Sequence, residues 1–330
     1  DYLCISSHSK VKQALIEYAT EYGFGSGSST LICGYTKLHE KFEKDFAEFV
    51  ERDRAILLNS GYHANLAALT VLANKDTSIL SDKLCHASII DGIMLSKAKH
   101  FRFRHNDVSH AKSLFKSNAL LITESVFSME GDIAPVQELA TLSSGNIIVD
   151  DAHGFGILGK NGRGVVEHAD NIQCLITPLG KALGGLGGVI SGSTDLIEAI
   201  IQFSRTYKYT TALPPSVVGA LIAALEVLKT ESWRRHKLIE LCNFFIEQCR
   251  ILSIPLISDA ITPIMSIIIG ENNKALLLKE KLRELGLFVS CIRAPTVSID
   301  KARMRISLNC SHDESSIKHL LNSIGQNAKF

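Results

Sequence analysis

Short apolar runs alternate with amphipathic segments along the first two thirds of the chain. The runs are rich in Ile, Leu and Val, have the length of buried strands, and occupy residues 55–58, 78–80, 120–124, 147–149 and 174–176. The clearest helical spacing places Leu38, Phe42, Phe46 and Phe49 on one face of a helix over 37–50. Further helices are expected over 11–22, 64–72, 194–203 and 215–228 and from residue 86. This alternation predicts an α/β fold with a mostly parallel sheet flanked by helices.

The last third of the chain has a different pattern. Helices over 231–249, over 274–285 and from residue 313 alternate with strands over 265–269 and 302–308. A chain of 330 residues is longer than one hydrophobic core usually supports. We therefore expect a large domain over residues 1–228 and a small α+β C-terminal domain over residues 229–330.

Composition narrows the class of partner. A net charge of +1 gives no field strong enough to recruit nucleic acid or an anionic membrane, and no apolar stretch is long enough to span a bilayer. Eight cysteines without a C-x-x-C pair indicate reduced thiols and a cytoplasmic location. The opening Asp1 fits neither a signal peptide nor an initiator methionine, so we expect the sequence to begin inside a longer protein. The expected partners are a small molecule and a second copy of the chain.

The segment 177–188 sets Lys181 among five glycines directly after an apolar strand. Glycine lets the backbone approach a flat ligand closely, which suits a lysine that forms a Schiff base. A solvated lysine in a flexible loop is the alternative. A phosphate-binding Walker loop is excluded, because Ala182 follows the lysine and Leu175 stands where that motif needs glycine.

Polar residues also stand at the ends of other strands. Ser60 and Gly61 form a turn between a strand and a helix, which is a potential anion site. Glu124 and Asp150 end or follow strands, and His86 opens a helix. Because the carboxyl ends of parallel strands share one edge of a sheet, we expect these side chains to meet in one crevice.

Two other interpretations are weaker. Residues 154–159 fit G-x-G-x-x-G, but they are separated from their strand and no helix follows, so a dinucleotide fold is not expected. Asp150, Asp151 and His153 could ligate a metal, but neighbours on an extended segment alternate faces and no second cluster has metal-ligand spacing. We therefore expect no metal.

An amine, a strand-end acid, a histidine able to stack and a Ser-Gly turn are together what pyridoxal 5'-phosphate requires. At these residues the sequence resembles the α-oxoamine synthase family of fold type I pyridoxal phosphate enzymes. The resemblance covers essentially the whole chain, with motifs at 34–40, 60–62, 86–88, 105–107, 124–131, 150–154, 179–184, 209–215, 293–296 and 303–305. It implies a transferase that is a homodimer with shared active sites.

The resemblance also implies a role for individual residues. Lys181 holds the cofactor as an imine and takes the substrate α-proton, Asp150 pairs with the pyridinium nitrogen, and His86 stacks on the ring and contacts substrate. These three are the expected catalytic residues. The other implied cofactor contacts are Gly61, Tyr62, Glu124, Ser128 and His153, with Thr210 and Thr211 reaching the phosphate of a neighbouring subunit. Arg305 and Thr296 are the further substrate contacts, to the amino acid carboxylate and the acyl group.

The implied reaction is the decarboxylative condensation of L-alanine with a pimeloyl thioester, carried by coenzyme A or a carrier protein, in biotin biosynthesis. The alternatives are another member of the family, such as a glycine C-acetyltransferase, and a non-catalytic homologue that binds the cofactor. The sequence departs from the family pattern in two respects. Pro178 stands where the pattern has a phosphate-binding threonine, and the N-terminal segment that carries a substrate-contacting arginine does not precede Asp1.

Overall fold

A computed structural model describes residues 1–328 as two compact units. The first unit comprises residue 1 and residues 3–126 and 134–232. The second comprises residue 2, the segment 127–133 and the chain from residue 233 onward. The expected division into independently folding domains at residues 228 and 229 stays a prediction.

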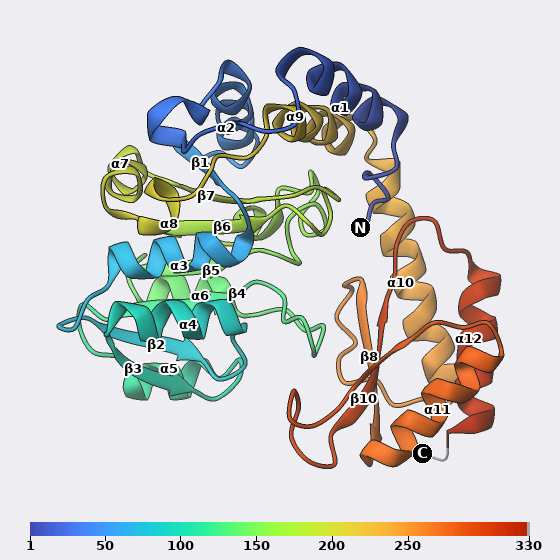
Figure 1. Ribbon diagram of the computed structural model, residues 1–330. Helices are drawn as coiled ribbons and strands as arrows, with labels where there is room; N and C mark the ends of the chain where they lie inside the picture. Colours follow the sequence, from blue (N-terminus) through green and yellow to red (C-terminus); the bar gives the residue numbers. More distant parts are fainter. Residues whose placement is uncertain (329–330) are drawn as a thin grey trace. The chain divides into compact units, whose positions relative to one another are not determined.

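A seven-stranded sheet forms the centre of the first unit (Figure 1). Its order is β1-β7-β6-β5-β4-β2-β3. Strand β7 runs in the direction opposite to the other six strands. The strands are β1 (Arg54–Leu58), β2 (Ser78–Asp82), β3 (Lys99–Phe103), β4 (Leu120–Glu124), β5 (Ile147–Asp150), β6 (Cys174–Pro178) and β7 (Gly188–Gly192). The predicted α/β fold with a mostly parallel sheet is confirmed.

Helices surround this sheet (Figure 1). They are α1 (Ser9–Tyr22), α2 (Lys37–Phe49), α3 (Gly61–Leu72), α4 (Ala87–Ser96), α5 (Val108–Leu114), α6 (Val136–Leu142), α7 (Thr194–Phe203), α8 (Arg205–Lys208) and α9 (Pro215–Thr230), with a π-turn over Thr30–Gly34 and a 3₁₀ turn over Gly164–Glu167. Cross-strand isoleucines of the central strands form one core with the alanines of α3. A Cβ on Gly92 of α4 would lie 2.7 Å from Leu69 Cδ1 of α3, so glycine allows these two helices to pack closely. This packing brings together the helix starts that carry Gly61 and His86.

Three elements differ from expectation. Edge strand β3 is missed because Lys99, His100 and Arg102 give it too many polar positions for an apolar run. Strand β7 begins and ends with glycine, so the sequence pattern does not separate it from the preceding glycine-rich loop. Helix α3 begins at Gly61, before the expected residue 64, because Ser60 caps it by accepting the His63 N–H at 3.2 Å.

The second unit contains a three-stranded antiparallel sheet of order β8-β10-β9, as the α+β pattern predicts. Its elements are β8 (Ile264–Gly270), β9 (Ser290–Ile292), β10 (Ala302–Ser307), α10 (Trp233–Ile251), α11 (Asn272–Glu284) and α12 (Glu314–Asn327). The segment 127–133 is fixed to this sheet: the Thr262 hydroxyl donates to Gly131 O and the Ser266 hydroxyl donates to Met129 O, both at 2.7 Å. Arg303 and Glu130 form an ion pair at 2.8 Å in the same place.

All eight cysteines have free thiols. Across residues 1–328, no helix has both the length and the apolar content that crossing a bilayer requires.

Candidate active site at the carboxyl end of the sheet

Two carboxyl side chains end neighbouring strands. Glu124 is the last residue of β4, Asp150 is the last residue of β5, and the two face each other in register. Both are buried. Lys181 lies three residues after the last residue of β6. Strand β6 pairs with β5 on the side opposite to β4. The topology thus places these two carboxyl groups at the same edge of the sheet.

The two carboxyl groups are buried side by side, and this affects the pKa of each. Burial raises the pKa of Glu124 well above its usual range, and the negative charge of Asp150 raises it further. Burial also raises the pKa of Asp150, but a hydrogen bond from Asn65 and the positive charge of Lys181 oppose this shift. Both carboxyl pKa values are thus raised by burial, and the contacts of Asp150 favour its charged form.

His86 stands at the start of α4. Its backbone N–H donates to Glu124 Oε1 at 2.6 Å, and its Nδ1 accepts the Ser88 N–H at 3.2 Å, which caps the helix. The His86 ring is exposed. One edge of the imidazole is thus fixed to the protein while a face remains available to a ligand.

Asn65 connects this histidine region to the acid. It lies on α3 with only 1% of its surface exposed, and its Nδ2 donates to Asp150 Oδ2 at 2.7 Å and to Ser88 Oγ at 3.0 Å. The second Asp150 oxygen accepts the Ala152 N–H at 3.0 Å. Sequence reasoning missed Asn65 as a site residue. The available signal was a lone polar residue within the Ala- and Leu-rich stretch 64–69.

The Ser60–Gly61 turn lies against the end of β6. A Cβ on Gly61 would lie 2.4 Å from Pro178 Cγ, so the proline ring occupies the space that any side chain at position 61 would need. Gly188 is equally close to this turn, since its Cβ would lie 2.6 Å from Ser60 O. Tyr62 is exposed, and its hydroxyl donates to the Asp91 carboxylate.

The loop that carries Lys181 is ordered by its own backbone. Leu179 N–H donates to Gly187 O and Gly185 N–H donates to Leu179 O, both at 3.0 Å. Gly184 and Gly187 have positive φ angles of 68° and 115°, which favour glycine. The half-buried lysine therefore stands in a closed turn rather than in the flexible loop that was the alternative.

The turn after β5 carries His153, which is buried. Turns and bends occupy residues 152–162, and the element that follows is only the 3₁₀ turn over Gly164–Glu167. The G-x-G-x-x-G segment therefore lacks the helix that a dinucleotide site requires. Asp151, fully buried, instead accepts the Val165 N–H at 3.0 Å and holds this loop together.

Thr210 and Thr211 lie in the connection between α8 and α9. The Thr211 carbonyl accepts a hydrogen bond from Asn59 Nδ2 at 2.9 Å, which places this connection beside the residue that precedes the Ser60–Gly61 turn. Thr210 is half-buried and Thr211 is exposed.

The remaining predicted residues belong to the second unit. Arg305 of β10 donates from Nε to Ser128 O at 2.5 Å and from Nη1 to Ser307 Oγ at 2.8 Å. Thr296 is exposed in the turn after β9. Within this unit the structure thus brings Arg305 and Ser128 together.

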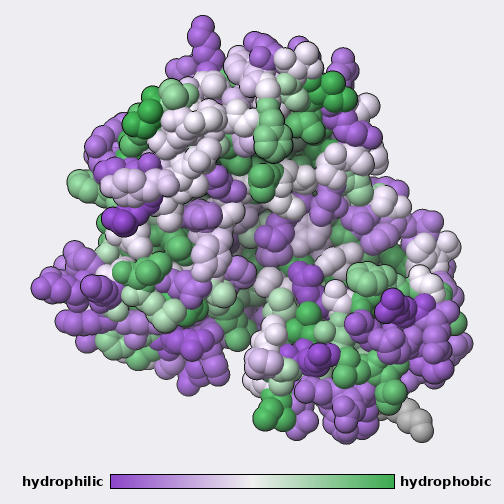
Figure 2. All heavy atoms as spheres, in the orientation of Figure 1, coloured by the Kyte–Doolittle hydropathy of each residue, from purple (hydrophilic) through white to green (hydrophobic). Residues whose placement is uncertain are grey.

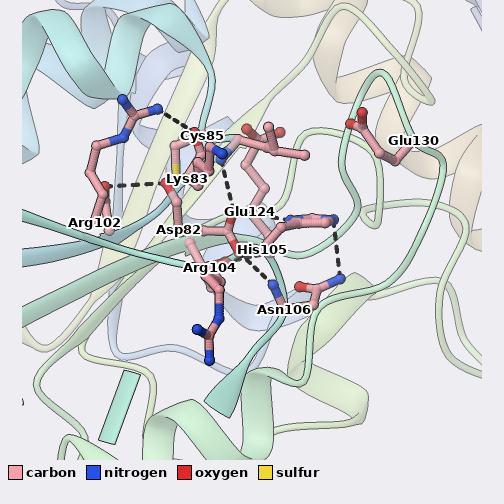
Figure 3. A network of polar contacts seen from close by, with 12 residues as sticks. Asp82, Lys83, Cys85, Arg102, Arg104, His105, Asn106, Glu124 and Glu130 are labelled. Atoms are coloured by element: carbon pink, nitrogen blue, oxygen red, sulfur yellow. Dashed lines mark hydrogen bonds and ion pairs between the residues drawn. The ribbon is translucent and has the colours of Figure 1, made fainter. Parts of the chain in front are cut away.

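A second polar network surrounds Asp82 at the end of β2 (Figure 3). This fully buried carboxylate accepts the Leu84 N–H at 2.8 Å and the Asn106 N–H at 2.9 Å, and it lies 3.0 Å from His105 Nδ1. Its charge contributes to the raised pKa of Glu124. The network fixes the 105–107 motif beside the strand end that carries Glu124.

Comparison with known proteins places the chain in a family. The model of a family described as aminotransferase class I and II matches residues 2–324. The chain belongs to the aminotransferase class I and II family. A relative from Saccharophagus degradans, 8-amino-7-oxononanoate synthase, is 42% identical over 99% of this chain and 85% of its own length.

Solved structures of this aminotransferase family agree with the fold. The crystal structure of 8-amino-7-oxononanoate synthase from Francisella tularensis has a TM-score of 0.91 and 39% identity, covering 99% of this chain and 95% of that one. A serine palmitoyltransferase from S. paucimobilis, solved with bound PLP-myriocin aldimine, has a TM-score of 0.93 and 27% identity over 99% of this chain and 85% of that one. The resemblance inferred from the sequence motifs is confirmed.

Proposed function

We propose that this protein is a pyridoxal phosphate-dependent 8-amino-7-oxononanoate synthase. The reaction joins Cα of L-alanine to the carbonyl carbon of a pimeloyl thioester. It releases 8-amino-7-oxononanoate, CO2 and the free thiol of coenzyme A or of a carrier protein. The observation that carries the proposal is the buried Asp150 carboxylate, held by Asn65 at the end of β5 in a chain that is 42% identical to such a synthase.

The residues of this edge fit pyridoxal phosphate. A buried carboxylate is costly without a cation, and the protonated pyridine nitrogen is a cation that would offset the cost at Asp150. The first N–H groups of α3, at Gly61 and Tyr62, have no partner within the helix and are aligned with its dipole, which suits a phosphate. Lys181 supplies the amine. When bound, the cofactor forms an imine with amino groups and withdraws electrons from the adjacent carbon.

The protein's own groups then have distinct tasks. Lys181 takes the α-proton of alanine on Nζ and later returns a proton to the same carbon. Asp150 would keep the ring nitrogen protonated, and Glu124 holds the backbone N–H of His86 beside it. With the cofactor bound, the motif resemblance implies that His86 would cover the ring face and that His153 would bond the ring hydroxyl.

The assignments of Ser128, Thr210 and Thr211 to the cofactor, and of Arg305 and Thr296 to the substrates, rest on the motif resemblance. A homodimer with shared sites and a cytoplasmic location are parts of the same proposal. Large apolar side chains exposed in the first unit are consistent with a partner surface; they include Ile16, Phe24, Ile32, Phe203 and Tyr209. Figure 2 shows hydrophobic residues interrupting the hydrophilic surface.

Borohydride reduction of the cofactor-loaded protein, followed by peptide mapping, tests the proposal. We expect the modified peptide to carry the label on Lys181 and the label to be lost in Lys181→Arg, with Lys208→Arg as the matched control. Turnover of L-alanine with pimeloyl-CoA should accompany this labelling. Modification of a different lysine would contradict the site, and turnover of glycine with acetyl-CoA alone would favour the acetyltransferase. Labelling of Lys181 without any turnover would favour a non-catalytic homologue.

A further inference from the structure

We propose that Asn65 and Ser88 are positioning residues that connect the Asp150 carboxylate to the His86 ring and fix that ring as its Nε2–H tautomer. The inference rests on the proposed function for the roles of His86 and Asp150. The tautomer itself is a property of the protein alone, so it can be measured without substrate or cofactor.

The Asp150 carboxylate sets the donor and acceptor roles in this series of hydrogen bonds. An ionised carboxylate can only accept hydrogen bonds, so the Asn65 amide must direct its NH2 group toward Asp150 Oδ2, 2.7 Å away. The second proton of the same NH2 group then points to Ser88 Oγ at 3.0 Å. Turning the amide over would set its carbonyl oxygen against the carboxylate. The charge on Asp150 therefore decides the orientation of Asn65.

Ser88 connects Asn65 to His86 through two contacts to the imidazole. The backbone N–H of Ser88 points at His86 Nδ1 from 3.2 Å, and a peptide N–H can only donate, so Nδ1 must carry a lone pair. The Ser88 hydroxyl already accepts from Asn65, and its own proton is free to donate to the same Nδ1, 2.8 Å away. Two donors thus converge on Nδ1, and the ring proton is placed on Nε2.

Burial makes this arrangement rigid. Asn65 and Ser88 are each 1% exposed, and α3 and α4, which carry them, are held close by Gly92. His86, in contrast, is an exposed residue. The consequence is a neutral imidazole that presents an N–H donor on its open edge. A neutral ring is also the form that can lie against a cationic pyridinium without charge repulsion.

The test measures the tautomer directly in the cofactor-free protein. Two-bond 1H–15N spectra of protein labelled at histidine distinguish protonated from unprotonated ring nitrogens, and the His86 signals are assigned by their loss in His86→Gln. We expect the wild-type signals of an acceptor Nδ1 and a protonated Nε2. Ser88→Ala removes the hydroxyl, the closer of the two donors to Nδ1, and keeps the peptide N–H at 3.2 Å, so we expect the Nε2–H signature to weaken without disappearing. Asn65→Leu leaves the Ser88 hydroxyl without its fixed donor, and we expect a smaller change in the same direction. Ser88→Thr, which keeps a hydroxyl, should retain it.

Ser96→Ala is the matched control, because Ser96 is a buried serine of the same helix whose hydroxyl donates to Ile93 O at 2.7 Å. It should leave the His86 signals unchanged. In the loaded enzyme, Ser88→Ala should lower kcat about tenfold, the size expected for one lost hydrogen bond to a polar ring, while KM for alanine stays within about twofold. Circular dichroism on each variant establishes that it is folded before its spectra are compared.

An unchanged Nε2–H signature in folded Ser88→Ala and Asn65→Leu would overturn the inference, as would an equal change in Ser96→Ala. If the proposed function is wrong but the tautomer inference is right, the experiments give a different pattern. In that case the cofactor-free spectra would behave as described while no alanine and pimeloyl-CoA turnover is found in the wild type.

Discussion

The close approach of Pro178 to Gly61 predicts that Gly61→Ala lowers the stability of the fold. The new methyl group would lie 2.4 Å from Pro178 Cγ and 2.6 Å from Pro178 Cβ. Ordinary contacts of this kind are about 3.5–4.0 Å, so α3 or the end of β6 must move by about 1 Å. A change of proline ring pucker moves mainly Cγ, so the overlap with Cβ would remain. Overpacking of this size costs about 1–3 kcal/mol, which corresponds to a fall of several degrees in the melting temperature.

A double-mutant cycle isolates this contact. Pro178→Ala removes the ring, so we expect Gly61→Ala to be far less costly in that background, with a coupling energy of about 1–2 kcal/mol. Gly25→Ala is the matched control, because no heavy atom lies within 4 Å of its Cβ position. Thermal unfolding of the cofactor-free protein gives the stabilities, and equilibrium dialysis with pyridoxal phosphate gives the effect on binding. Equal losses for Gly61→Ala in both backgrounds would refute the reasoning.

Three further predictions concern charged groups. Asp150→Asn removes a fully buried charge partner, so we expect turnover to fall by at least about 100-fold while borohydride still labels Lys181, and a fall of less than tenfold would contradict the role of Asp150. Burial raises the pKa of Asp151 from 3.8 to about 7, so the folded state binds this proton more tightly than the unfolded chain. Stability should therefore fall by about 2–4 kcal/mol as the pH rises from about 4 to about 7, and urea unfolding across this range should show a flatter profile for Asp151→Asn. Glu130→Gln breaks the largely buried ion pair with Arg303 and should destabilise the second unit by about 3 kcal/mol in thermal unfolding, whereas Lys281→Gln, in an exposed pair, should cost less than about 0.5 kcal/mol.

The parts that sequence could predict are those governed by local patterns. Continuous apolar runs predicted β4 and β5 correctly, and the parallel topology then placed Glu124 and Asp150 at one edge. Strands β3 and β7 were missed because their polar and glycine positions are tolerated only through pairing with neighbours distant in sequence. Asn65 was missed for a similar reason. Nothing in the helix that carries it indicates that Asp150, 85 positions later, lies within hydrogen-bond distance.

The Pro178 departure is visible in the sequence, but its structural consequence is not. Only the coordinates show that the proline ring fills the space above Gly61. Similarly, Gly154 belongs to a segment that matches a dinucleotide motif by letter, and Gly164 follows that segment. In the structure a Cβ on Gly154 or Gly164 would lie 2.1 Å and 1.9 Å from the two Asp151 carboxyl oxygens, so these glycines make room for a buried acid.

The second unit is discontinuous in sequence, and this affects when it can fold during synthesis. Residues 127–133 leave the ribosome well before the sheet strands that hold them, β8 and β10, have been synthesised. Until Thr262, Ser266 and Arg303 emerge, the early segment has no sheet to join. A fragment that starts at residue 233 would lack the carboxylate partner of Arg303 and would expose the β8 groups that normally receive this segment. The second unit can therefore reach its native state only after nearly the whole polypeptide has been made.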